Sequence, residues 1–101
     1  MMLLLFLPLY VALSFERNST APSLTIIAPL PNSTTEKPFT TLQGAATPSS
    51  EVFINKDPIV LRDTGAFTER IALHAGLNAI TITARRFGID TVVTRTIVYN
   101  P

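Results

Sequence analysis

The chain has 101 residues, eight Lys and Arg against seven Asp and Glu, and no cysteine. Its length fits one small domain, and its near-neutral charge offers nucleic acid no basic surface. Without cysteine there is no disulfide framework, thiol nucleophile or thiolate zinc site; for a domain outside the cytoplasm, this fits a bacterial envelope better than an animal secreted immunoglobulin domain.

The first segment, residues 1–15 (MMLLLFLPLYVALSF), is almost entirely apolar. As a helix it would be about 22 Å long at ~1.5 Å per residue, shorter than the ~30 Å hydrocarbon core of a bilayer. No Lys or Arg precedes the apolar run, although a signal peptide usually has them. We expect a short hydrophobic helix that is either an export signal or part of a membrane anchor whose remainder is missing. Residues 16–23 then form a polar tether, and the following domain lies outside the cytoplasm.

From Leu24 onward, short apolar-alternating runs are separated by turn residues, and no window has a helical period. The sequence predicts an all-β domain over residues 24–101, in which two packed antiparallel sheets form an immunoglobulin-like β-sandwich of about seven strands. The expected strands are Leu24–Ala28, Phe39–Ala46, Glu51–Asn55, Ile59–Leu61, Ala66–Leu73, Ala79–Arg86 and Thr91–Tyr99.

Alternation also assigns faces within these strands. In the sixth run, Ile80, Ile82 and Ala84 are predicted to point into the core. Their neighbours on the same run are predicted to point outward: Thr81, Thr83 and Arg85. Gly44, in the second run, is expected at a bulge or at a close approach between the sheets.

Few residues suggest catalysis or metal binding. His74 is the only histidine, and its sequence neighbours include neither a nucleophile nor an orienting carboxylate, so we expect a solvated loop residue. Glu51, Asp57 and Asp63 could approach one another and hold calcium, but they lack the dense oxygen ligands of a calcium loop, and solvated turns are the simpler interpretation. We expect no catalytic residue, no metal and no cofactor.

A possible binding surface comprises two aromatic and two basic residues. Phe53 lies on the face opposite the predicted core, and Phe87 lies at a turn tip, so either ring could stack on a sugar or on another domain. Arg85 and Arg86, with Arg70 and Arg95, concentrate positive charge on late strands, where a cell-wall polymer or an anionic lipid could bind. The alternatives are packing of the rings under loops, and cross-strand pairing of the arginines with Glu69 or Asp90.

Four runs carry a family resemblance: VFIN (52–55), DTGAF (63–67), LHAGLNAITITA (73–84) and FG (87–88). Together, over about Pro22–Tyr99, they resemble the bacterial immunoglobulin-like modules related to the B domain of glucodextranase. The resemblance implies structural turn roles for Gly65, Gly76, Asn78 and Gly88, and no chemistry. Lys56 stands where the family often has Gly, so a different turn type is expected after Asn55.

The resemblance implies a non-catalytic binding or spacer module of the bacterial cell envelope, membrane-anchored or secreted. Its expected partners are the membrane, through residues 1–15, and neighbouring protein domains or cell-wall glycan, but no nucleic acid. One alternative is the extracytoplasmic domain of a single-pass membrane regulator resembling RodZ, whose cytoplasmic helix-turn-helix part is absent here. A further alternative is a carbohydrate-binding accessory module that uses Phe53 or Phe87.

Overall fold

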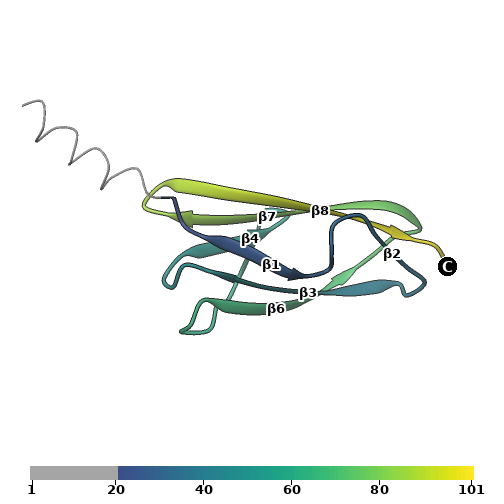
Figure 1. The fold of residues 1–101 in the computed structure, drawn as a ribbon, viewed down its shortest axis with the longest axis horizontal. Coiled ribbons are helices and arrows are strands. Elements are labelled where there is room, and N and C mark those ends of the chain that lie inside the picture. Colours follow the sequence, from purple (N-terminus) through teal and green to yellow (C-terminus); the bar gives the residue numbers. More distant parts are fainter. Residues whose placement is uncertain (1–20) are drawn as a thin grey trace, which may run out of the picture.

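The computed structural model describes residues 21–101, which form two facing β-sheets (Figure 1). The three-stranded sheet has the order β1-β3-β6, with β1 Leu24–Ala28, β3 Phe39–Ala46 and β6 Ala66–Ala72. The five-stranded sheet has the order β2-β8-β7-β4-β5, with β2 Ser33–Thr35, β8 Ile89–Tyr99, β7 Gly76–Arg86, β4 Glu51–Ile54 and β5 Asp57–Ile59. The expected hydrophobic helix and residues 16–20 of the tether lie outside the described residues.

The all-β, immunoglobulin-like sandwich is confirmed, with corrections to its strands. An eighth strand, β2, pairs in parallel with the end of β8, so the sandwich is not wholly antiparallel. Its sequence, Ser-Thr-Thr, has no apolar alternation, and for this reason the pattern did not predict it. Strand β5 starts at Asp57 rather than Ile59, because the turn before it has only two residues. Strands β7 and β8 extend closer to their turns than predicted.

The core lies between the two sheets and consists of alternate residues of the paired strands. Strand β7, at the centre of the five-stranded sheet, supplies Ile80, Ile82 and Ala84, each at most 1% exposed, as alternation predicted. The other buried apolar residues are Ile26, Leu42, Ala46, Val52, Ile54, Phe67 and Ile97.

Gly44 marks a close contact inside the three-stranded sheet. A Cβ at this position would lie 2.6 Å from the Thr25 carbonyl oxygen and 2.7 Å from Cζ of Phe67. Beside it, the pairing of β1 with β3 shifts register between Ile26 and Ala28, which is the signature of a bulge. The expected bulge is therefore present beside Gly44, in β1, whereas the close approach lies within the three-stranded sheet and not between the two sheets. Only glycine leaves room for the Phe67 ring at this position.

Arg95 joins the two sheets along the side where β1 lies beside β8. It points inward from β8, opposite Ile80, and its guanidinium donates from Nε to the Pro29 carbonyl and from Nη2 to the Ile26 carbonyl, at 3.1 and 3.4 Å. These hydrogen bonds satisfy the carbonyl of Ile26 in β1 and that of Pro29, just beyond the end of β1. Arg95 therefore closes an edge of the sandwich and takes no part in a basic surface.

Candidate functional site

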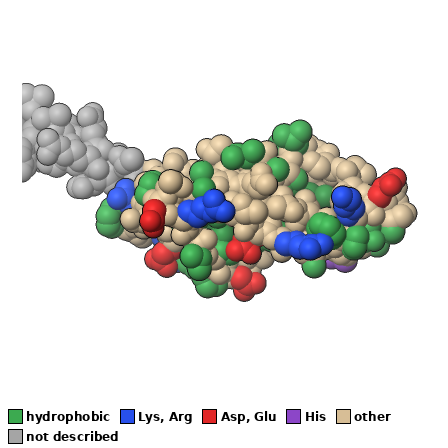
Figure 2. All heavy atoms as spheres, turned by 90° about the horizontal axis from the view of Figure 1, so that it is seen from below, with side chains coloured by type: hydrophobic (Ala, Val, Ile, Leu, Met, Phe, Trp, Pro, Cys, Tyr) green, Lys and Arg blue, Asp and Glu red, His purple; other side chains and the backbone are tan. Residues whose placement is uncertain are grey.

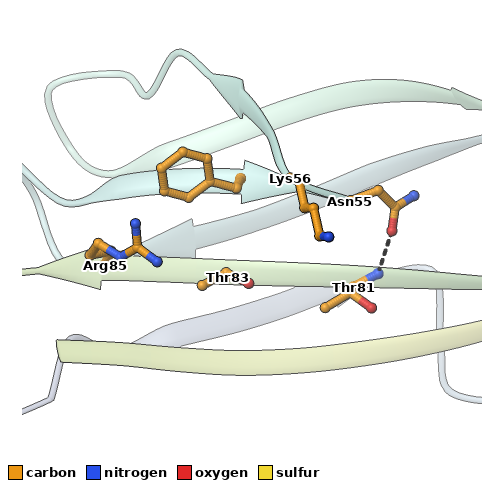
Figure 3. Close-up of a pocket in the computed structure, with 6 residues that line it drawn as sticks. Asn55, Lys56, Thr81, Thr83 and Arg85 are labelled. Carbon is orange, nitrogen blue, oxygen red and sulfur yellow. Dashed lines mark hydrogen bonds between the residues drawn. The ribbon is translucent and has the colours of Figure 1, made fainter. Parts of the chain in front are cut away.

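A shallow groove lies on the outer face of the five-stranded sheet, where β4 and β7 run side by side (Figure 3). Its volume is about 620 Å³, and it is lined by Phe53, Asn55, Lys56, Thr81, Thr83 and Arg85. The two threonines form its floor, while the remaining side chains rise from β4, from the turn that follows β4, and from the end of β7.

The pairing of β4 with β7 brings these residues together. Phe53 is directly opposite Thr83, and Glu51 is directly opposite Arg85. Because Val52 and Ile54 of β4 are buried in the core, the alternation of the strand turns Phe53 outward. The groove therefore rests on two hydrogen-bonded strands, which hold its side chains more firmly than a loop could.

The turn after β4 forms one end of the groove. Asn55 and Lys56 have φ angles of 49° and 76°, and together they form the two-residue turn that joins Ile54 to its partner Asp57. Positive φ at both central residues defines a type I′ turn, the conformation that Asn-Gly favours. The expectation of a different turn type at Lys56 is therefore wrong, because the lysine adopts the conformation that glycine takes most easily.

Asn55 fixes this turn against β7. Its backbone N–H donates to the Thr81 carbonyl at 2.9 Å, and its side-chain Oδ1 accepts from the Thr81 N–H at 3.0 Å (Figure 3). The β4–β5 turn is therefore tied to the floor of the groove, and this connection sets where the Lys56 side chain emerges.

Arg85 is held at the opposite end of the groove by an exposed ion pair. Its Nε and Nη2 donate to Oδ1 and Oδ2 of Asp90 at 2.7 and 3.1 Å, and its guanidinium carbon lies 5.3 Å from the centre of the Phe53 ring. The hydrogen bond from Arg85 lowers the pKa of Asp90 below its ordinary value, and the same bond raises the pKa of Arg85. The pair thus positions a permanent cation beside an aromatic ring.

The four residues predicted to form a binding surface lie in two separate parts of the domain. Phe53 and Arg85 share the groove, whereas Phe87 and Arg86 lie at the tip of the β7–β8 hairpin, with the Arg86 guanidinium carbon 4.9 Å from the Phe87 ring centre. Phe87 is 88% exposed, and Phe53 is only partly exposed.

The structure adds groove residues that the sequence reasoning did not select: Asn55, Lys56, Thr81 and Thr83. Alternation already turned both threonines outward, so a signal for the floor was present. For Asn55 and Lys56 the available signal was the Asn-Lys pair, which was interpreted only as a departure from the Asn-Gly of the resembling family.

The three predicted turn glycines lie where the chain reverses or changes strand, whereas Asn78 lies inside β7. Gly65, Gly76 and Gly88 have φ angles of 90°, 97° and 75°. Asn78 is buried, and its side chain serves the preceding loop: Oδ1 accepts from the His74 N–H at 3.0 Å, and Nδ2 donates to the carbonyls of His74 and Gly76 at 2.9 and 3.0 Å. These contacts are structural.

The remaining candidates do not form a site with one another. His74 is exposed, and its Nδ1 lies 3.2 Å from the Ala75 carbonyl oxygen. Glu51 and Asp57 belong to opposite ends of the β4–β5 pair, and residues 21–101 contain no group of three His, Cys, Asp or Glu side chains placed to hold a metal ion. In the same part of the chain, no helix is long and apolar enough to cross a membrane.

The four arginines are also dispersed. Arg70 lies over the ring of Phe39, 3.5 Å from its centre, on the outer face of the three-stranded sheet. Arg95 bonds to the Pro29 and Ile26 carbonyls, where β1 lies beside β8. The cross-strand pairing expected for the arginines is observed for Arg85 with Asp90. Figure 2 shows basic and acidic side chains interspersed on the face seen from below.

Comparisons with known proteins agree with this architecture. Residues 22–100 match the family described as "Glucodextranase, domain B". Among solved structures, the fold is similar to the fibronectin(III)-like modules of Clostridium thermocellum CbhA, with a TM-score of 0.55 and 14% sequence identity over 79% of this chain. The match spans 47% of the solved chain, and at this identity it shows a shared fold alone. No curated protein matches the chain.

Proposed function

Because the chain belongs to the glucodextranase domain B family, we propose that its sandwich is a binding and spacer module of the bacterial cell envelope, working outside the cytoplasm. The sandwich itself is an immunoglobulin-like accessory module and is non-catalytic. In this proposal, residues 1–15 export the module or hold it at the membrane. The outer-face groove is its binding surface.

The observation that carries the proposal is the composition of the groove. The six lining side chains comprise one aromatic ring, two cations, two threonine hydroxyls and one amide. None of them is a carboxylate, an imidazole or a thiol, so the lining places no base beside the Lys56 amine or the threonine hydroxyls that could activate them as nucleophiles. Such a groove can hold a ligand and has no means of converting it.

The same composition favours one ligand class, a cell-wall glycan. The Phe53 ring offers an apolar surface on which a sugar ring can stack, and the hydroxyls of Thr81 and Thr83 can exchange hydrogen bonds with sugar hydroxyls. Lys56 and Arg85, at the two ends of the groove, suit a glycan that carries negative charge. Carbohydrate binding is therefore the finer form of the proposal.

The domain contains a matched control for testing this form. Phe53 beneath Arg85, in the groove, resembles Phe39 beneath Arg70 on the outer face of the other sheet. We expect the full chain to be retained on one or more members of a panel of insoluble glycans that includes peptidoglycan. Phe53→Ala should abolish this retention, and Phe39→Ala should preserve it.

Equal loss in both variants would show that retention does not depend on the groove. No retention on any glycan would remove the carbohydrate form and leave the spacer form, which a second measurement tests. A reporter enzyme that is active only outside the cytoplasm, fused after Pro101, should be active in a bacterial host. An inactive fusion would overturn the proposed location.

The alternative of a single-pass regulator resembling RodZ stays a prediction. So does the use of the module to contact neighbouring protein domains. Comparing the mass of the exported protein with that of the full chain separates a cleaved signal from a retained anchor in residues 1–15.

A further inference from the structure

One end of the sandwich combines the entry point of the chain with the most exposed apolar side chains. Phe87, at the tip of the β7–β8 hairpin, and Val60, after β5, are each 88% exposed. The β7–β8 hairpin and the start of β1 lie at this same end (Figure 1). The Thr91 hydroxyl, four residues beyond Phe87, donates to the Pro22 carbonyl at 2.6 Å, which fixes the incoming chain beside the hairpin.

Nothing in the fold requires a phenylalanine at position 87. The residue has a φ of 52° and is the first central residue of a two-residue turn, a position that favours Asn, Asp or Gly over a bulky side chain. Its ring is outside the core, and its nearby cation is Arg86. An exposed ring held in an unfavourable backbone conformation points to a contact made outside the domain.

The chain before residue 21 indicates what that contact is. Residues 1–15 are apolar, and seven residue steps separate Phe15 from Pro22. A fully extended chain of that length spans at most about 25 Å. If residues 1–15 enter a bilayer, the Phe87 end of the sandwich is thus kept within reach of the bilayer surface, while the C-terminal end lies at the opposite end of the sandwich (Figure 1).

We propose that this end of the sandwich rests on a phospholipid surface, with the Phe87 ring at the level of the lipid headgroups. This inference rests on the proposed anchoring of residues 1–15 in a membrane. Aromatic rings favour that depth, and the long side chain of Arg86 can reach the headgroups while its stem stays beside the ring.

The contact depends on apolar insertion and not on attraction to anionic lipid. The charges in this part of the molecule have both signs: Arg62, Arg85 and Arg86 against Glu51, Asp63 and Asp90. Membrane contact by Phe87 should therefore persist in zwitterionic phosphatidylcholine vesicles and change little with salt.

The chain contains no tryptophan, which allows a direct test with single-tryptophan variants. Phe87→Trp places the probe at the hairpin tip, and Val60→Trp places a second probe at the same end. Leu77→Trp is the matched control, because Leu77 is 63% exposed at the other end of β7. Each full-length variant is reconstituted in phosphatidylcholine vesicles with and without brominated lipid, whose bromines quench tryptophan at short range.

We expect F87W to lose most of its emission in brominated vesicles, V60W to lose a smaller share, and L77W to keep its emission. Flotation of the vesicles measures anchoring separately, and circular dichroism verifies that each variant retains its β structure. A chain that floats but shows equal emission from F87W and L77W would overturn the contact and leave the anchor intact. A chain that does not float would overturn both.

Discussion

The two faces of β7 differ in burial and in the chemistry of their side chains. The inner face carries Ile80, Ile82 and Ala84, which are almost completely buried. The outer face, displaced by one residue or about 3.3 Å along the strand, carries Thr81 and Thr83 at the floor of the groove and Arg85 at one end of it. Packing decides which residues fit the inner positions. The outer positions are free of that constraint, so their chemistry is the better guide to binding.

This difference has a thermodynamic consequence. Substitutions on the inner face should change the free energy of unfolding and leave any ligand contact alone, whereas substitutions on the outer face should do the reverse. Paired substitutions on the two faces measure how completely stability and binding separate between them.

The largest effect is expected for Ile82→Ala, because Ile82 is fully buried. The substitution removes apolar contacts and leaves a cavity, which costs about 2–5 kcal/mol in free energy of unfolding. Its neighbour on the outer face supplies the control: Thr83→Ala should cost less than about 1 kcal/mol, the span of strand propensities.

Urea unfolding of both variants, followed by far-UV circular dichroism, measures the two costs under identical conditions. A loss for Thr83→Ala as large as that for Ile82→Ala would mean that the outer face also stabilises the fold. The distinction between the faces would then fail.

The next effect concerns Asn78, a polar residue on the inner face. Its amide bonds to the backbone of His74 and Gly76, and Nδ2 also lies 3.4 Å from the Ile97 carbonyl oxygen. Asn78→Ala leaves buried backbone groups without partners and should cost about 1–3 kcal/mol. The burial of this amide shows that the inner face is not purely apolar.

Asn78→Asp sharpens the test, because it keeps the side chain's size and its acceptor but replaces the donating amide. A carboxylate would face carbonyl oxygens, so at neutral pH this variant should be less stable than Asn78→Ala. A stability equal to the parent chain would show that the Nδ2 hydrogen bonds contribute little, and that Asn78 acts through its shape and its Oδ1 acceptor.

A smaller effect, opposite in sign, is expected at the outer-face turn. Lys56 has a φ of 76°, a left-handed conformation that costs a residue with a Cβ about 1 kcal/mol. Lys56→Gly should therefore stabilise the domain by about that amount. Lys56→Ala keeps the Cβ and should give no gain, so the pair of variants separates the backbone effect from the loss of charge.

The same two variants address binding. If the Lys56 ammonium contacts the ligand, both should weaken glycan retention equally, although only one of them gains stability. Weakened retention in Lys56→Ala alone would show that turn geometry, and not the charge, matters for the groove.

The sequence predicted the inner face better than the outer one for a physical reason. Burial imposes a period of two on apolar residues, so Ile80, Ile82 and Ala84 could be assigned without knowing their neighbours. The strand β2 has no buried apolar residue, and it is a strand only because it reaches the edge of β8 after the chain leaves β1. Nothing in the Ser-Thr-Thr sequence itself predicts the pairing of β2 with β8.

The groove needed information that a single strand does not contain. Phe53 and Arg85 were each selected from the sequence, but their grouping depends on the register that places Phe53 opposite Thr83. The position of Lys56 depends on turn geometry. The chemistry of each side chain could be recognised from the sequence. Grouping the side chains into one site required the pairing of β4 with β7, in which Phe53 and Thr83 are 30 positions apart.

The smallest effect on stability is expected from the exposed pair of Arg85 and Asp90. Because Arg85 lowers the pKa of Asp90, the pair stabilises the folded state above the ordinary pKa of an aspartate, about 3.9. That stabilisation is lost as the pH falls through the lowered value. The difference in unfolding free energy between the parent chain and Asp90→Asn should therefore be small near neutral pH, shrink with added salt, and vanish in acid.

Arg85→Gln should show the same pH dependence, and the double variant should add nothing further. A difference that grows on acidification would contradict the assigned sign. So exposed a pair contributes little to folding, and we expect it to act by orientation, because two hydrogen bonds from Arg85 to Asp90 hold the guanidinium beside Phe53. Asp90→Asn should consequently weaken glycan retention clearly while it barely changes stability, which is the behaviour expected of an outer-face residue.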